Sequence, residues 1–191
     1  DIIDHCNENQ IEAILTSKNH QTGSDRLAEA CNLLNLDEEM LIVNVQGDEP
    51  FMPLAIINSL TSHLSKDLSI ATACVPLTDR KLLEDPNEVK VVRSLSKRAM
   101  YFSRSLIPNE FTSGYDSYLK HLGIYAYENK TLQELTALKP TSNELQEKLE
   151  QLRFLDHGYN IFVEDYPYES PIGIDTPADL ERAIEFSKAN D

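Results

Sequence analysis

The chain has 191 residues, 41% of them hydrophobic, which is enough to bury the core of one substantial domain. Its formal net charge of -15 argues against a protein that works on nucleic acid, because neutralising phosphates requires a basic surface. No stretch approaches the roughly 20 apolar residues that a membrane helix needs, and the acidic opening lacks the Lys or Arg of a secretory signal. We therefore expect a soluble protein.

The N-terminal part of the sequence predicts helices followed by one buried strand. The first residues, DIIDHCNENQ, indicate part of a helix, and Glu12 to Thr16 a short strand. A helix is predicted to begin at Thr22, because the residues from Thr22 to Asp25 offer N-cap chemistry and apolar residues then recur at helical spacing. The run MLIVNV, Met40 to Val45, has no polar alternation, which predicts a strand buried on both faces of a parallel sheet.

The rest of the chain alternates between predicted strands and helices. Helical sequence covers 53–64, two further helices follow residue 128, and a last helix follows Thr176, where TPADLERA carries a capping box. Predicted strands cover 69–77, 88–95, 99–106, 119–127 and 161–166. This alternation predicts an α/β fold in one domain over 1–191, with a mostly parallel sheet flanked by helices.

Two predicted features bear on where a site is built. The second helix after residue 128, Asn143 to Asp156, carries Leu145, Leu149, Leu152 and Leu155 on one stripe and is predicted to be continuous. The segment from Pro108 to Tyr118 is the one long break between elements, and we interpret it as an active-site or interface loop rather than a domain linker.

An acid pair follows the strand MLIVNV directly, in the sequence NVQGDEP. Ligands of open α/β sheets bind beyond the carboxyl ends of the strands, so Gln46, Asp48 and Glu49 are predicted to lie at the binding edge. Asp175 also follows a strand and directly precedes a helix cap. Two such carboxylates can share one Mg²⁺, whose remaining ligands are water and phosphate oxygens. Turn formation by Asp48 and capping by Asp175 are the structural alternatives.

Further polar residues stand on predicted strands and helices. Arg104 can offer a bidentate fork to a carboxylate or phosphate, although it can also be a surface residue. His121 and Tyr125 lie on one face of an extended segment, and Glu150 and Gln151 lie beside the leucine stripe, where a solvated helix face is the simpler interpretation. The loop from His20 to Ser24 leads into a helix N-terminus that can bind an anion or a base edge.

The cysteines argue against a metal or disulfide framework. Cys6, Cys31 and Cys74 are widely spaced and form no CxxC pair. Their spacing predicts reduced thiols in a cytoplasmic protein and disfavours a zinc site.

Seven motifs stand in the order found in one enzyme family. They are HQTGSDRLAEA, IVNVQGDEP, NEVKVV, YFSRSLIP, KHLGIYAY, LEQLRFL and GIDTPADLERA. In these motifs, which span essentially the whole chain, the sequence resembles the bacterial 3-deoxy-manno-octulosonate cytidylyltransferases. The resemblance implies a nucleotide-diphospho-sugar transferase fold and transfer of CMP from CTP to the sugar acid KDO, for lipopolysaccharide synthesis. It also implies Mg²⁺ as cofactor and a homodimer in the cytoplasm.

The resemblance also implies roles for single residues. Asp48 and Asp175 match the catalytic, metal-binding pair. The sugar-acid pocket is matched by Gln46, Arg104, His121, Tyr125, Glu150 and Gln151, and the wall around cytosine and ribose by Gln21, Gly23, Ser24 and Arg26. The family opens with a strand and a basic loop that grips the triphosphate. The sequence begins at Asp1 without such a segment. We therefore expect a chain truncated at its N-terminus, with most phosphate-binding cations missing.

Three other functions are compatible with some of these features. A cytidylyltransferase for sialic acid or for an amino variant of KDO would share the metal pair and differ in the sugar pocket. A non-catalytic relative would bind nucleotide without releasing pyrophosphate. A dinucleotide-dependent oxidoreductase is disfavoured, because the chain contains no GxGxxG motif.

Overall fold

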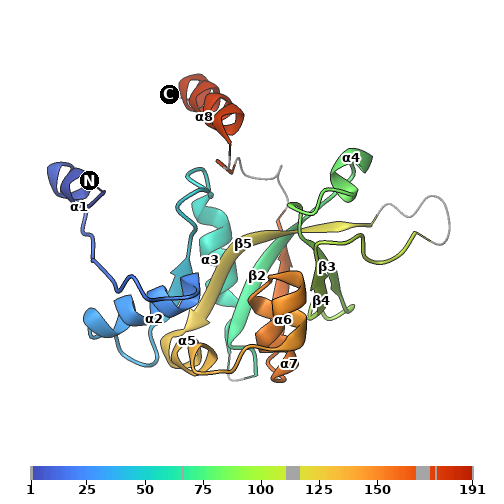
Figure 1. The fold of residues 1–191 in the computed structure, drawn as a ribbon, viewed down its shortest axis with the longest axis horizontal. Helices are drawn as coiled ribbons and strands as arrows, with labels where there is room; N and C mark the ends of the chain where they lie inside the picture. Colours follow the sequence, from blue (N-terminus) through green and yellow to red (C-terminus); the bar gives the residue numbers. More distant parts are fainter. Residues whose placement is uncertain (1, 66, 111–116, 167–172, 175, 191) are drawn as a thin grey trace.

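The computed structural model describes residues 2–65, 67–110, 117–166, 173–174 and 176–190 of the chain. These residues form an α/β fold with a six-stranded sheet flanked by helices, as the sequence predicts (Figure 1). The strands are β1 (Leu41–Asn44), β2 (Ile70–Pro76), β3 (Lys90–Arg93), β4 (Ala99–Ser103), β5 (Leu119–Glu128) and β6 (Ile161–Asp165). The helices are α1 (Ile2–Glu8), α2 (Gly23–Leu33), α3 (Leu54–Ser62), α4 (Arg80–Leu83), α5 (Asn129–Thr136), α6 (Ser142–Glu147), α7 (Gln151–Asp156) and α8 (Pro177–Asn190).

The long strand β5 organises the sheet. It pairs with β2 over nearly its whole length, with β3 near its start at Lys120, and with β1 from Tyr125 to Glu128. The strand order along the main path is β4-β3-β5-β2-β6, with β1 added to β5. β5 therefore joins β1, β2 and β3, and it is the long diagonal yellow ribbon of Figure 1.

The pairing within the sheet differs from the parallel arrangement that the sequence predicts. β1, β2 and β3 all pair antiparallel with β5, and β4 pairs antiparallel with β3. Parallel pairing occurs between β2 and β6. The reason is that β5 runs against its neighbours and lies between strands that share one direction. Alternation of strands and helices along the chain does not reveal such an inserted strand.

Two apolar layers cover the two faces of the sheet, and alternate residues of β2 and β5 contribute to each. On one face, Ala71, Ala73 and Val75 pack with Leu122 and Ile124 of β5 against α3. On the other, Ile70, Tyr125 and Tyr127 join residues of α2, α5 and α7. The period of two in these strands explains this division, because successive side chains point to opposite faces.

β1 is less buried than predicted. Ile42 is buried, whereas Leu41 is exposed and Val43 and Asn44 are half-buried. The exposure of Leu41 shows that the apolar run MLIVNV does not mark a strand covered on both faces. β1 also has a strand partner on one side only among the described residues. The predicted strand from Glu12 to Thr16 is also absent, because that segment has no strand assignment and pairs with none of the described strands.

The predicted helix from Asn143 to Asp156 is two short helices, α6 and α7. The chain leaves the helical path at Lys148, whose backbone is left-handed at φ 54° and ψ 48°. Leu145 is exposed, whereas Leu149 and Leu152 are buried, so the leucine stripe does not form one continuous face. The break lets residues 149–151 turn toward the sheet.

Helix caps follow the sequence more closely. The Thr22 hydroxyl accepts from the Asp25 amide, as the predicted N-cap chemistry requires, and the Asp25 carboxylate accepts from the Thr22 amide, which completes a capping box at the start of α2. Thr176 and Asp179 make the same pair of contacts at the start of α8. No helix in the described part of the chain is long and apolar enough to cross a membrane.

Candidate active site

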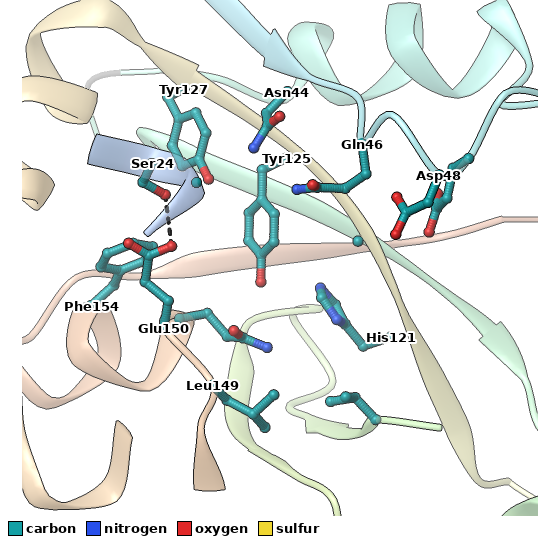
Figure 2. Close-up of a pocket in the computed structure, with 15 residues that line it drawn as sticks. Ser24, Asn44, Gln46, Asp48, His121, Tyr125, Tyr127, Leu149, Glu150 and Phe154 are labelled. Atoms are coloured by element: carbon teal, nitrogen blue, oxygen red, sulfur yellow. Dashed lines mark hydrogen bonds between the residues drawn. The ribbon is translucent and has the colours of Figure 1, made fainter. Parts of the chain in front are cut away.

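A cavity of about 360 Å³ lies on the sheet face that α2 and α7 cover, beside the end of β1. This volume is in the range of small-molecule sites. Figure 2 shows Ser24 and Glu150 at one end of the cavity, Gln46 and Asp48 at the other, and Tyr125 and His121 between them. The lining residues are Gly23, Ser24, Asn44, Gln46, Asp48, Glu49, Val89, His121, Gly123, Tyr125, Tyr127, Leu149, Glu150, Gln151 and Phe154.

β5 supplies one side of the cavity through alternate residues. The rings of His121 and Tyr125 are 5.4 Å apart, and Tyr125 and Tyr127 stack at 5.8 Å. Phe102 of β4 packs edge-on against His121, with ring centroids 5.0 Å apart. These rings are buried, and their packing fixes the direction in which each polar atom points. Gly123 lies between them, where a Cβ would approach Glu49 Oε1 to 3.4 Å.

The break between α6 and α7 supplies the opposite side. Leu149, Glu150 and Gln151 turn into the cavity at this point. Arg104 supports the break, because its guanidinium donates to the carbonyl oxygens of Glu147 at 2.9 Å and Pro86 at 2.8 Å. The Glu147 carboxylate in turn accepts from the Ser103 hydroxyl and the Arg104 amide. Carbonyls freed at the end of α6 thus find donors.

A buried ion pair holds α6 against α7. Arg153 donates to both carboxylate oxygens of Glu144, at 2.8 Å and 2.5 Å, and both side chains are buried. Glu144 also completes a capping box with Thr141 at the start of α6. The two short helices are therefore fixed relative to each other, and so is the Glu150 segment between them.

Glu150 is a half-buried acid of the cavity wall. Its Oε2 accepts from the Ser24 hydroxyl at 2.8 Å, while its Oε1 is buried and has no hydrogen-bond partner among the described residues. Burial raises the pKa of Glu150, although the neighbouring side chains of Thr22 and Ser24 oppose that effect. The Tyr125 hydroxyl is likewise buried without a partner in the described part of the chain. Unpaired buried polar atoms indicate a site that a polar ligand completes.

The acidic end of the cavity follows β1. The Glu49 amide donates to the Gln46 carbonyl at 3.1 Å, which forms the turn that presents Asp48, an exposed residue. The Ile174 amide donates to the Asp48 carbonyl at 2.8 Å, so the chain at residue 174 lies against Asp48. Asp175 itself lies outside the described residues. Within the described ranges, no three His, Cys, Asp or Glu side chains converge as a metal cluster.

The predicted nucleotide residues are divided between two hollows. Gly23 and Ser24, at the first turn of α2, line the main cavity. Arg26 lines a neighbouring hollow of about 390 Å³, where its guanidinium donates to Thr16 Oγ1 at 2.5 Å. Gln21 lines neither hollow, and its amide donates to the Asn19 carbonyl. The two hollows adjoin, because they share Gly23, Asn44 and Gln46.

The structure therefore brings most predicted sugar-pocket residues together and leaves one apart. Gln46, His121, Tyr125, Glu150 and Gln151 line the cavity with Asp48, whereas Arg104 does not. The lining residues that were not predicted are Asn44, Val89, Gly123, Tyr127, Leu149 and Phe154. Asn44 and Tyr127 lie two residues from Gln46 and Tyr125, so the strand period could have identified them. Leu149 and Phe154 reach the cavity through the helix break, which the sequence did not indicate.

Comparisons with known proteins place this geometry in context. The family described as Cytidylyltransferase matches residues 1–163. A 3-deoxy-manno-octulosonate cytidylyltransferase of Polynucleobacter necessarius subsp. necessarius is 48% identical over 182 residues, which cover 93% of this chain and 72% of that protein. The protein of the same name from Psychromonas ingrahamii is 40% identical over 198 residues, which cover 97% of this chain and 77% of that protein.

Solved structures agree with these matches. The structure of CMP:2-keto-3-deoxy-manno-octonic acid synthetase complexed with CTP superposes with a TM-score of 0.90 at 33% identity, covering 100% of this chain and 78% of that one. A putative glucose-1-phosphate thymidylyltransferase from Bacillus anthracis superposes with a TM-score of 0.60 at 15% identity, which shows a shared fold alone.

Proposed function

The chain belongs to the cytidylyltransferase family, and from this premise we propose that it transfers CMP from CTP to 3-deoxy-manno-octulosonate (KDO), releasing pyrophosphate. The product is the activated sugar donor for lipopolysaccharide synthesis. One observation carries the proposal. A single cavity joins a wall of hydrogen-bonding groups, formed by His121, Tyr125, Glu150 and Gln151, to the acidic end at Asp48.

The cavity suits a ligand with many hydroxyls. Its described lining residues include three acids, Asp48, Glu49 and Glu150, and no Lys or Arg. Carboxylates and the amide oxygens of Asn44, Gln46 and Gln151 accept hydrogen bonds, which sugar hydroxyls can donate. The wall therefore orients the sugar, and the substrate's own negative charges need cations from outside this set of lining residues.

Transfer of a nucleotidyl group asks mainly for placement. The attacking hydroxyl of the sugar must lie in line with the bond from the α-phosphorus to the leaving pyrophosphate, and charge on the phosphates must be neutralised. In this arrangement the wall holds the sugar and the N-terminal turn of α2, at Gly23 and Ser24, lies beside it. The adjoining hollow with Arg26 is the place we assign to the nucleoside.

We assign Asp48 and Asp175 to a magnesium site. Support comes from the exposure of Asp48 at the cavity edge and from the hydrogen bond of Ile174 to the Asp48 backbone, which brings the neighbour of Asp175 to this place. Carboxylates are suitable ligands for Mg²⁺, which retains positions for water and substrate oxygens. When bound, the ion would neutralise phosphate charge and lower the pKa of a coordinated hydroxyl.

Arg104 keeps a predicted role in binding the sugar carboxylate. In the structure its guanidinium donates to the Glu147 carbonyl at the helix break and to the Pro86 carbonyl before β3. A homodimer in the cytoplasm is a further part of the proposal, as the family resemblance implies. Light scattering of the purified protein and fractionation of the producing cells test these two properties.

The proposed reaction is tested by pyrophosphate release from CTP, KDO and Mg²⁺. We expect release that depends on all three, and formation of CMP-KDO in equal amount. Replacing KDO with sialic acid should abolish release, whereas a preference for sialic acid or for an amino-KDO would assign another substrate. Binding of CTP without any release would contradict catalysis.

The metal assignment needs its own test. The Asp175→Asn variant should need a higher Mg²⁺ concentration for half-maximal rate than the unmodified chain. An unchanged magnesium dependence in this variant would refute the assignment of Asp175.

A further inference from the structure

His121, which lines the cavity, makes a hydrogen bond to Thr72, which does not line it. Thr72 is not among the predicted site residues. Thr72 lies on β2 and is completely buried. Its Oγ1 lies 3.0 Å from His121 Nε2, 2.7 Å from the Ile124 carbonyl oxygen and 3.2 Å from the Leu122 carbonyl oxygen. A single hydroxyl therefore faces a ring nitrogen and two carbonyls.

A bulge in β5 produces this arrangement. β2 and β5 pair Thr72 with Tyr125 but the next residue, Ala73, with Leu122, so β5 carries two additional residues here. Residues in a bulge lose their regular partners across the strand ladder. The Thr72 hydroxyl lies close to the carbonyl oxygens of Leu122 and Ile124 at this irregular place.

The number of protons decides which atom donates. A hydroxyl has one proton, and a carbonyl oxygen can only accept. The 2.7 Å separation from the Ile124 oxygen is an ordinary O–H···O length, so the Thr72 proton belongs to that bond. Oγ1 must then accept from His121, which requires that Nε2 carries the ring proton.

The imidazole itself is neutral. Burial lowers the pKa of His121 to about 3, and the nearby charge of Lys120 acts in the same direction. A neutral ring with its proton on Nε2 has a lone pair on Nδ1, which can accept a hydrogen bond. Nδ1 has no hydrogen-bond partner in the described part of the chain, and His121 lines the cavity.

We propose that Thr72 is a positioning residue that holds His121 in the Nε2–H tautomer and so presents Nδ1 to the cavity as an acceptor for a substrate hydroxyl. The identity of that substrate rests on the proposed function, whereas the tautomer does not. A ring in the other tautomer would present a donor instead, and a sugar hydroxyl would have to turn its lone pair toward it.

The tautomer can be read directly by NMR of the ¹⁵N-labelled chain, because protonated and unprotonated ring nitrogens have widely separated shifts. The five histidines are assigned by comparison with a His121→Gln variant. We expect the free chain to show the proton of His121 on Nε2. The Thr72→Ser variant should keep this pattern, and Thr72→Val, which retains the branched shape but has no oxygen, should show the Nδ1–H form.

Kinetics then separate positioning from folding. With Thr72→Val we expect KM for the sugar acid to rise roughly three- to tenfold, the usual effect of one neutral hydrogen bond, with KM for CTP unchanged. Thr72→Ser should restore the original KM, which a loss of packing alone would not explain. Thermal melts of both variants show whether either has unfolded.

Three results would overturn the proposal. The first is a His121 proton on Nδ1 in the unmodified chain, a measurement that does not depend on any variant folding. The second is an unchanged tautomer in Thr72→Val. The third is an equal KM for the sugar in Thr72→Val and Thr72→Ser. Failure of the chain to turn over KDO would refute the proposed function and leave the NMR result to decide the tautomer.

Discussion

The two ends of the cavity are built in different ways. At one end, the wall formed by His121, Tyr125, Glu150 and Gln151 is buried except for the half-buried Glu150, and it is supported by neighbouring rings, the Ser24 hydroxyl and the broken helix. At the other end, the rim formed by Gln46 and Asp48 is exposed and follows a short strand with one partner among the described strands. The positions of the wall side chains are therefore fixed by the folded chain itself. The positions of the exposed rim side chains depend instead on the ligand that binds there.

The rim should give the largest effect on catalysis with the smallest effect on stability. We expect Asp48→Asn to lower kcat/KM about 1000-fold, since charge stabilisation by a metal is worth several kcal/mol. Its Tm should not change, because Asp48 is exposed. Asp37→Asn, at an exposed acid outside the cavity lining, is the control and should leave turnover intact. Normal activity in Asp48→Asn would show that the rim does not contribute to catalysis and would contradict this contrast between rim and wall.

The wall should respond most strongly to loss of its buried ion pair. Glu144→Ala leaves Arg153 charged and buried, which costs about 3–5 kcal/mol of unfolding free energy. Urea unfolding measures this loss. Glu110→Ala, which breaks the more exposed pair with Arg80, should cost less than about 1 kcal/mol. Equal losses in the two variants would show that the buried ion pair stabilises the fold no more than the exposed pair does.

The left-handed residue at the helix break offers a smaller test. Lys148→Val places a branched side chain at φ 54°, and we expect a loss of about 1–2 kcal/mol in the free energy of unfolding. KM for the sugar should rise as well, because Leu149 and Glu150 follow directly. Lys148→Gly, which accepts this backbone without strain, should keep both values. A stable Lys148→Val variant would indicate that the break does not need this conformation.

The smallest expected effect is the pH dependence of stability at Glu150. Burial raises its folded-state pKa above the ordinary value of 4.5, so the folded chain binds the proton more tightly than the unfolded chain. Stability from this group is therefore present at low pH and is lost as pH rises from about 4.5 through the folded pKa. Glu150→Gln lacks this loss.

The Tm difference between Glu150→Gln and the unmodified chain should accordingly increase over that pH window and then level off. Thermal melts at a series of pH values measure it. A difference that is constant with pH, or one that shrinks, would contradict a buried carboxylate at this position.

The sequence predicted the elements of the rim better than those of the wall. Asp48 was placed at the end of a strand because a β-branched run, a glycine and an acid are local signals, and that placement is found. Glu150 was placed within a continuous helix, beside its leucine stripe, whereas the structure breaks the helix two residues earlier at Lys148. No Gly or Pro marks the break. It is stabilised by Arg104, far away along the chain, which donates to the Glu147 carbonyl.

The same contrast between local signals and long-range contacts explains which features of the sheet were predicted. β5 was correctly predicted as a strand from its composition, yet its antiparallel position between β1 and β2 depends on which strands meet, and a single-chain pattern does not contain that information. The role of Thr72 was missed for a similar reason, since its partners His121 and Ile124 become neighbours only through the bulge.

The two additional residues in β5 also limit how this chain can change length. Because they come as a pair, the side chains before and after the bulge keep the same in-and-out parity, and His121 and Tyr125 share one face. Deleting one residue between them would turn His121 toward the opposite layer, whereas deleting both would restore a regular ladder. Insertions and deletions at this point should therefore be tolerated, if at all, in twos.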